Sequence, residues 1–158
     1  MGQCLPDVAG STTDAITVSR YVSGISGKQA MFDIEKQVAY WRDGAVEDWQ
    51  VAQDLVRRRQ VRHGLFFAHL ALEKLLKALV CRRTQDLAPR IHSLVRLAEM
   101  AGLPIERERV KLLAEINAFN LEGRYPDMTT PQPSPAEARA YLRRMGEVYQ
   151  WLMSQLSE

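Results

Sequence analysis

The stretch FFAHLALEKLLKA, residues 66–78, decides the fold class of this chain. Wound into a helix, it is apolar on nearly every side, which is typical of a helix at the centre of a bundle. It nevertheless carries charged and titratable groups at helical spacing, namely His69, Glu73, Lys74 and Lys77. Burying such groups is costly unless they are paired and hydrogen-bonded. The segment therefore marks either a specific structural network or a binding site.

Apolar residues recur at helical spacing on both sides of this stretch. We predict helices over about residues 34–59, 65–83, 93–101, 104–121 and 134–156, and we find no strand pattern. The last helix has the clearest start, because Ser134 as N-cap and Glu137 three residues later form a capping box. Gly102 and Gly123 are expected to end the third and fourth helices, and Pro104 suits the first turn of the fourth. The sequence predicts an all-α bundle of four to five helices.

The first thirty residues differ in composition from the rest. They are rich in Gly, Ser and Thr and show no sustained period. We predict a flexible N-terminal extension over residues 1–30 and one helical domain over residues 31–158, which is an ordinary domain size.

The charge balance excludes a surface that attracts nucleic acid everywhere. Lys and Arg number 21 against 19 for Asp and Glu, a formal net charge of +2, so any basic binding face has to be local. The sequence has no apolar run for a membrane span and no signal-peptide pattern. Its two cysteines, Cys4 and Cys81, are too few for a disulfide scaffold. We expect a cytoplasmic protein with reduced thiols and no membrane contact.

No cofactor or metal is predicted. The sequence contains no glycine-rich phosphate loop and no Cys or His cluster with metal-ligand spacing.

The segment Arg124-Tyr125-Pro126-Asp127 follows the fourth predicted helix. In one interpretation, Arg124 holds a phosphate through its forked donors while Tyr125 stacks on a base. In the other, Asp127 satisfies loop N–H groups and Arg124 pairs with a carboxylate of a neighbouring helix. Both interpretations fit a proline-rich turn.

Two further polar residues fall on apolar helix faces. Asp48 requires a cationic partner, for which Arg124, Lys74 and Lys77 are candidates; the pair is either a strut or part of a nucleotide pocket. His69 requires a hydrogen-bond partner, and Glu73 is in reach one turn later. His69 is either a satisfied core histidine or a general base.

Two basic groups surround predicted interhelical turns. The first comprises Arg57, Arg58, Arg59, Arg62 and His63, and the second comprises Arg82, Arg83, Arg90, His92 and Arg96. They are either a local face for RNA or nucleotide phosphates or solvated helix ends, where positive charge is favourable.

Four segments together resemble the HEPN domains (higher eukaryote and prokaryote nucleotide-binding). They are Ala45-x-x-Asp48-x-x-x-Ala52-x-x-Leu55, His69-x-x-x-Glu73-Lys74-x-x-Lys77-Ala78, Ile91-His92-Ser93-Leu94 and Arg124-Tyr125-Pro126-Asp127. The resemblance covers roughly residues 38–156. It implies an up-and-down helical bundle that commonly dimerises and is often encoded beside a minimal nucleotidyltransferase, with toxin–antitoxin pairs among its members.

The resemblance also implies that many members are metal-independent ribonucleases, with an Arg followed by four to six residues and a His. Arg124 matches the arginine, but residues 128–132 contain no histidine. We therefore interpret the chain first as a non-catalytic, dimeric module that binds a nucleotide or RNA. The predicted site residues are Arg124, Tyr125, Asp127, Asp48, Glu73 and Lys74.

Two alternatives stay open. In the first, the chain is a ribonuclease whose general base has moved to His69 or His92, with Arg124 stabilising the phosphate. In the second, it is an interaction scaffold whose charged motifs are struts.

Overall fold

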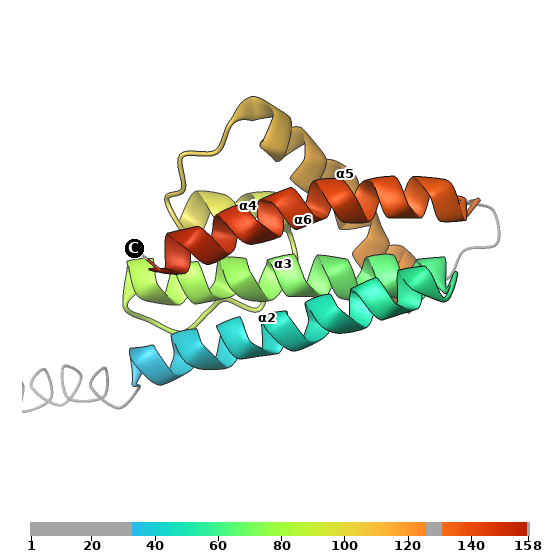
Figure 1. The fold of residues 1–158 in the computed structure, drawn as a ribbon. Helices are drawn as coiled ribbons and strands as arrows, with labels where there is room; N and C mark the ends of the chain where they lie inside the picture. Colours follow the sequence, from blue (N-terminus) through green and yellow to red (C-terminus); the bar gives the residue numbers. More distant parts are fainter. Residues whose placement is uncertain (1–32, 126–130, 158) are drawn as a thin grey trace, which may run out of the picture. The chain divides into compact units, whose positions relative to one another are not determined.

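The computed structural model describes residues 33–125 and 131–157 and folds them into a bundle (Figure 1). Its helices are α2 (Ile34–Arg57), α3 (Val61–Thr84), α4 (Leu94–Met100), α5 (Arg107–Arg124) and α6 (Pro135–Ser157). No strand occurs in the described residues. The all-α prediction is confirmed. The predicted extension, residues 1–30, lies outside the described part of the chain.

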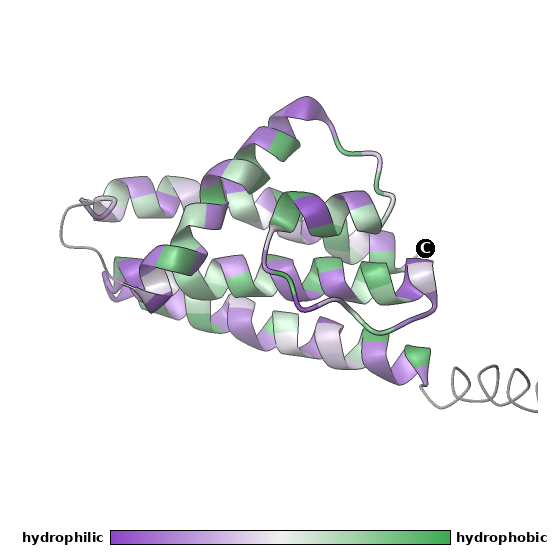
Figure 2. Cartoon of the chain, turned by 180° about the vertical axis from the view of Figure 1, so that it is seen from behind, coloured by the Kyte–Doolittle hydropathy of each residue, from purple (hydrophilic) through white to green (hydrophobic). Residues whose placement is uncertain are grey.

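Helix α3 is the centre of the bundle, as its composition predicts. It packs against α2, α4, α5 and α6, and its fully buried side chains include Leu65, Leu72, Leu75, Leu76 and Val80. The surrounding helices carry both hydrophilic and hydrophobic residues along their length (Figure 2). They therefore bury one side against α3 and leave the other in water.

The four long helices alternate in direction. Helices α2 and α5 end on the side of the bundle where α3 and α6 begin (Figure 1). Short connections favour this arrangement, because an antiparallel neighbour is the nearest place for the next helix. We call this side, which holds the end of α2, the start of α3, the end of α5 and the start of α6, the turn end of the bundle.

Three predicted helix boundaries are wrong, two of them for packing reasons. Helix α3 begins at Val61, four residues earlier than expected, because Val61 is buried and extends the core. Helix α5 begins at Arg107, beyond Pro104, and continues through Gly123 to Arg124. A Cβ on Gly123 would lie 2.4 Å from the Phe66 ring. Gly123 therefore permits close contact between α5 and α3 rather than ending the helix.

Two predicted end signals are confirmed. The Ser134 N–H donates to Glu137 Oε2 at 2.7 Å, and the Glu137 N–H donates to Ser134 Oγ at 3.2 Å, which is the reciprocal pattern of a capping box. Gly102, just after α4, has φ +64°, the left-handed conformation that favours glycine.

Candidate functional site

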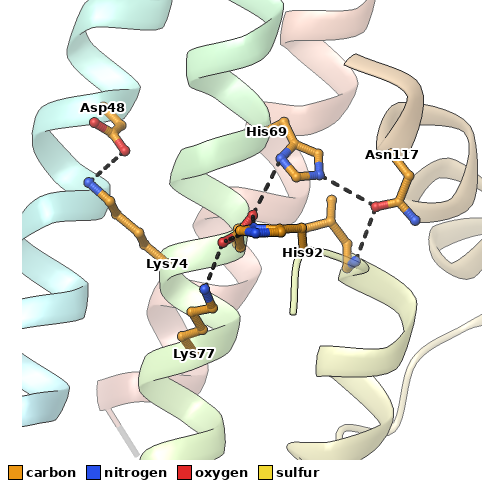
Figure 3. Close-up of polar contacts among 8 residues, drawn as sticks. Asp48, His69, Lys74, Lys77, His92 and Asn117 are labelled. Carbon is orange, nitrogen blue, oxygen red and sulfur yellow. Dashed lines mark hydrogen bonds and ion pairs between the residues drawn. The ribbon is translucent and has the colours of Figure 1, made fainter. Parts of the chain in front are cut away.

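Glu73 is the centre of a buried polar network, whose other members Lys77, His92 and His69 are labelled in Figure 3. Its side chain is only 5% exposed, and Oε1 accepts from Lys77 Nζ at 2.8 Å. The same carboxylate lies 3.0 and 3.1 Å from His92 Nδ1, which arrives from the loop before α4. Lys77 Nζ also lies 5.0 Å from the centre of the Trp41 ring on α2, a cation–π geometry. The network therefore links α2, α3 and the entry to α4.

His69 extends this network toward α5 (Figure 3). Its Nε2 donates to Asn117 Oδ1 at 3.4 Å, and its Nδ1 lies 3.8 Å from Glu73 Oε2. Asn117 Oδ1 also accepts the N–H of Leu94, the first residue of α4, at 3.1 Å. The predicted proximity of His69 and Glu73 is found, but Asn117 was not anticipated, because its partners are distant in sequence.

The environment of His69 keeps its imidazole neutral. Complete burial lowers the pKa of His69 to about 4. The Glu73 charge and the Asn117 hydrogen bond oppose this shift, and His92 and Arg124 add to it. A neutral ring fits the single hydrogen-bond donor that Asn117 requires. Because His69 has no exposed surface, it has no access to a substrate hydroxyl.

Asp48 and Lys74 form a separate contact between α2 and α3. Lys74 Nζ lies 2.7 Å from Asp48 Oδ2 and donates to the Gly44 carbonyl at 3.3 Å. Gly44 leaves room for this contact, since a Cβ there would lie 3.1 Å from Lys74 Nζ. Of the three cations predicted as partners for Asp48, the structure selects Lys74. The pair is a half-buried strut between the two helices.

Arg124 and Tyr125 lie together at the end of α5. Both are exposed, Tyr125 to 71%, and Tyr125 donates its N–H to the Leu121 carbonyl at 2.8 Å as the cap. Within residues 33–125 and 131–157, the Arg124 side chain forms no hydrogen bond or ion pair. Asp127, predicted to accompany it, lies outside the described residues.

The basic groups divide between structural and exposed positions. Arg82 donates to the carbonyls of Gln155 and Leu156 at the end of α6, where positive charge stabilises a helix C-terminus. Arg57, Arg58 and Arg59 are exposed at the turn end.

No described helix is long and apolar enough to cross a membrane. The described residues also contain no group of three or more His, Cys, Asp or Glu suited to a metal ion.

A family model for the HEPN domain matches residues 38–156, about three quarters of the chain. The chain belongs to the HEPN domain family. Two solved structures are similar to this HEPN chain in fold. TT1696 from Thermus thermophilus is 20% identical with a TM-score of 0.62, over 75% of this chain and 97% of that one. ST0689, described as an archaeal HEPN homologue, is 17% identical with a TM-score of 0.60, over 75% and 96%. No curated protein matches the chain.

The HEPN motifs do not converge on one pocket within this chain. Glu73, His69 and His92 lie where α3, α4 and α5 meet, Asp48 and Lys74 lie between α2 and α3, and Arg124 with Tyr125 lies at the turn end. Asp48 is paired with Lys74 and has no contact with Arg124. His92 is the most exposed member of the Glu73 network, with a side chain that is 46% exposed.

Proposed function

We propose that this HEPN chain is a non-catalytic, dimeric module that binds a nucleotide or an RNA end at the exit of α5. The observation that carries the proposal is the exposure of Arg124 and Tyr125 side by side on an anchored helix end. A guanidinium offers forked donors that match a phosphate, and a phenol ring offers a face on which any base can stack.

The anchoring of α5 supports this proposal. Gly123 lies directly against Phe66 of α3, and Asn117 ties α5 to both His69 and Leu94. A helix end held in this way fixes the backbone from which Arg124 projects, which lowers the entropic cost of binding. In the proposal Asp127 orients Arg124, while Asp48, Glu73 and Lys74 support the bundle behind the site.

The proposed assembly extends beyond one chain. Membership of the HEPN family supports a homodimer, in which two exposed Arg124 side chains double the local positive charge, and a minimal nucleotidyltransferase as the partner, in a toxin–antitoxin-like pair in the cytoplasm. Pull-down with a nucleotidyltransferase encoded beside this chain tests the partner; failure to co-purify counts against it.

Binding to the exit of α5 is tested with ATP and with a 5′-phosphorylated oligoribonucleotide, measured by calorimetry. Arg124→Ala removes a charge-assisted phosphate contact and is expected to weaken both ligands on the order of tenfold. Tyr125→Ala should weaken ATP while leaving inorganic pyrophosphate unaffected, because only the stacking partner is lost. The matched control is Arg42→Ala, an exposed arginine paired with Asp43 on α2. Equal binding by wild type and Arg124→Ala would refute the site.

One contact favours a second candidate function, a metal-independent ribonuclease. The Glu73 carboxylate binds His92 Nδ1 and thereby orients the ring of a half-exposed histidine, as a general base requires. RNA is incubated with the protein in a chelator, beside Arg124→Ala and His92→Ala. Cleavage to cyclic-phosphate ends that both substitutions abolish establishes the nuclease. Absence of cleavage by folded wild type leaves the binding module.

A further inference from the structure

A groove runs between the second half of α2 and the first half of α6, at the turn end of the bundle. Its volume is about 1090 Å³. Four arginines line it, Arg57 and Arg59 from the α2 side and Arg139 and Arg143 from α6, and Glu147 supplies the one carboxylate among its lining residues. We call it the arginine groove.

The arginine groove keeps an excess of positive charge, because its four arginines outnumber Glu147 and the Asp54 partner of Arg57. All four arginines are exposed, and among the described residues only Arg57 has a carboxylate partner, Asp54. Arg59 has φ +63°, a left-handed conformation that favours glycine over residues with a Cβ. An arginine thus occupies the one backbone position in this turn where a glycine would be less strained. Arg59 is part of the groove wall.

The floor of the groove offers little to an apolar ligand. Trp49 stacks on Tyr149 with ring centres 4.7 Å apart, and the bundle leaves Trp49 only 8% and Val56 only 2% exposed. Gly146 keeps the groove open above Trp49, since a Cβ there would lie 3.3 Å from the indole. A docking amphipathic helix needs buried apolar anchors, and stacking needs an exposed ring face. Among the apolar side chains that line the groove, only Leu142 is more than slightly exposed, which is too little to anchor an amphipathic helix, and Trp49 offers no open ring face, so binding here depends on charge.

We propose that the arginine groove binds the phosphodiester backbone of RNA without regard to base sequence. Guanidinium forks on the two facing walls of the groove are suited to phosphate oxygens, and the closed floor gives no base readout. This site is separate from Arg124 and Tyr125 and does not rest on the function proposed for them. It gives α2 and α6 a role in binding RNA, in addition to the ligand contacts proposed for the exit of α5.

The test measures binding of a fluorescein-labelled oligouridylate by fluorescence anisotropy over a range of salt concentrations. The double variant Arg139→Gln/Arg143→Gln is expected to weaken binding on the order of tenfold and to reduce the salt slope by roughly 0.7 per lost phosphate contact. The control Lys36→Gln/Arg42→Gln makes the same charge change on exposed residues in the first half of α2. It should bind as wild type. Circular dichroism checks that all variants fold.

Three results would overturn the proposal that the arginine groove binds RNA. In the first, the groove variant keeps wild-type affinity and slope; if Arg124→Ala alone abolishes binding, RNA is held only at the exit of α5 and the earlier proposal survives. In the second, the control loses as much as the groove variant, which would mean a response to net charge. In the third, oligoglutamate binds more tightly than oligouridylate and needs the same arginines, which would assign the groove to an acidic protein partner. If only the groove variant loses affinity for the oligouridylate and Arg124→Ala still binds it, the result supports RNA binding at the arginine groove independently of the α5 site.

Discussion

The Glu73 carboxylate lies in the interior of the bundle, where it accepts from the Lys77 ammonium and contacts His92 Nδ1. The prediction for Glu73→Gln follows from this geometry. The substitution keeps the shape but leaves the buried Lys77 ammonium without its counter-charge, so unfolding should become easier by about 3 kcal/mol. Urea denaturation measures the change. Glu108→Gln is the control, because the Glu108–Lys111 pair is exposed and should contribute little. Equal midpoints for both variants would contradict the role of the network.

The burial of His69 is expected to make the free energy of unfolding depend on pH. Its folded-state pKa is lowered from 6.5 to about 4, so between these values the unfolded chain binds more protons than the folded one. The free energy of unfolding therefore has its full value above pH 6.5, where the ring is neutral in both states. It falls by roughly 3 kcal/mol in total as the pH drops toward 4.

This dependence is measured as the difference between wild type and His69→Asn in urea denaturation across that pH range. The Asn variant should show a shallower fall in stability, whatever its stability at pH 7. His63→Asn, an exposed histidine, should fall in parallel with wild type. Parallel curves for all three proteins would show that His69 is not held neutral.

At the scale of one element, the capping box stabilises the start of α6. Ser134→Ala removes the acceptor for the Glu137 N–H and should lower the free energy of unfolding by about 1 kcal/mol. Ser154→Ala is the matched control, because the Ser154 hydroxyl only donates to the Trp151 carbonyl within the helix, and alanine is the better helix former. Thermal denaturation should therefore show a lower midpoint for Ser134→Ala alone.

The contact between α5 and α3 makes a second prediction at this scale. Gly123→Ala places a Cβ within 2.7 Å of three Phe66 side-chain atoms, Phe66 Cβ among them. The overpacking should cost roughly 1–3 kcal/mol, against a gain of ~1 kcal/mol in helix propensity. At Gly44 the nearest atom is the mobile end of Lys74, so Gly44→Ala should be close to neutral. Urea midpoints compare the two; a stable Gly123→Ala would mean that α5 moves away from Phe66 easily.

At the scale of the whole molecule, we expect a dimer. Light scattering after size exclusion at micromolar concentration should give about twice the chain mass of 18.0 kDa. A strict monomer would remove the doubled Arg124 site from the proposed function, while the arginine groove, which one chain completes by itself, would be unaffected.

The sequence by itself determined the elements and the family. The apolar period located each helix, the capping box started α6, and the motifs on α2, α3 and the entry to α4 indicated HEPN membership, because these signals are local in the chain. Local pattern also limited the partners of Asp48 to three cations. It failed at Gly123, where a residue that often ends helices serves instead to admit Phe66.

The tertiary structure alone decided which polar groups meet. His92 reaches Glu73 across 19 positions, and Asn117 reaches His69 across 48, because α4 and α5 fold back onto α3. The same packing separates Arg124 from Asp48 and brings Arg139 and Arg143 of α6 opposite Arg57 and Arg59. Hydrogen bonds and charge clusters depend on distances of a few ångströms between helices, and helix periodicity contains no information on which faces of distant helices meet.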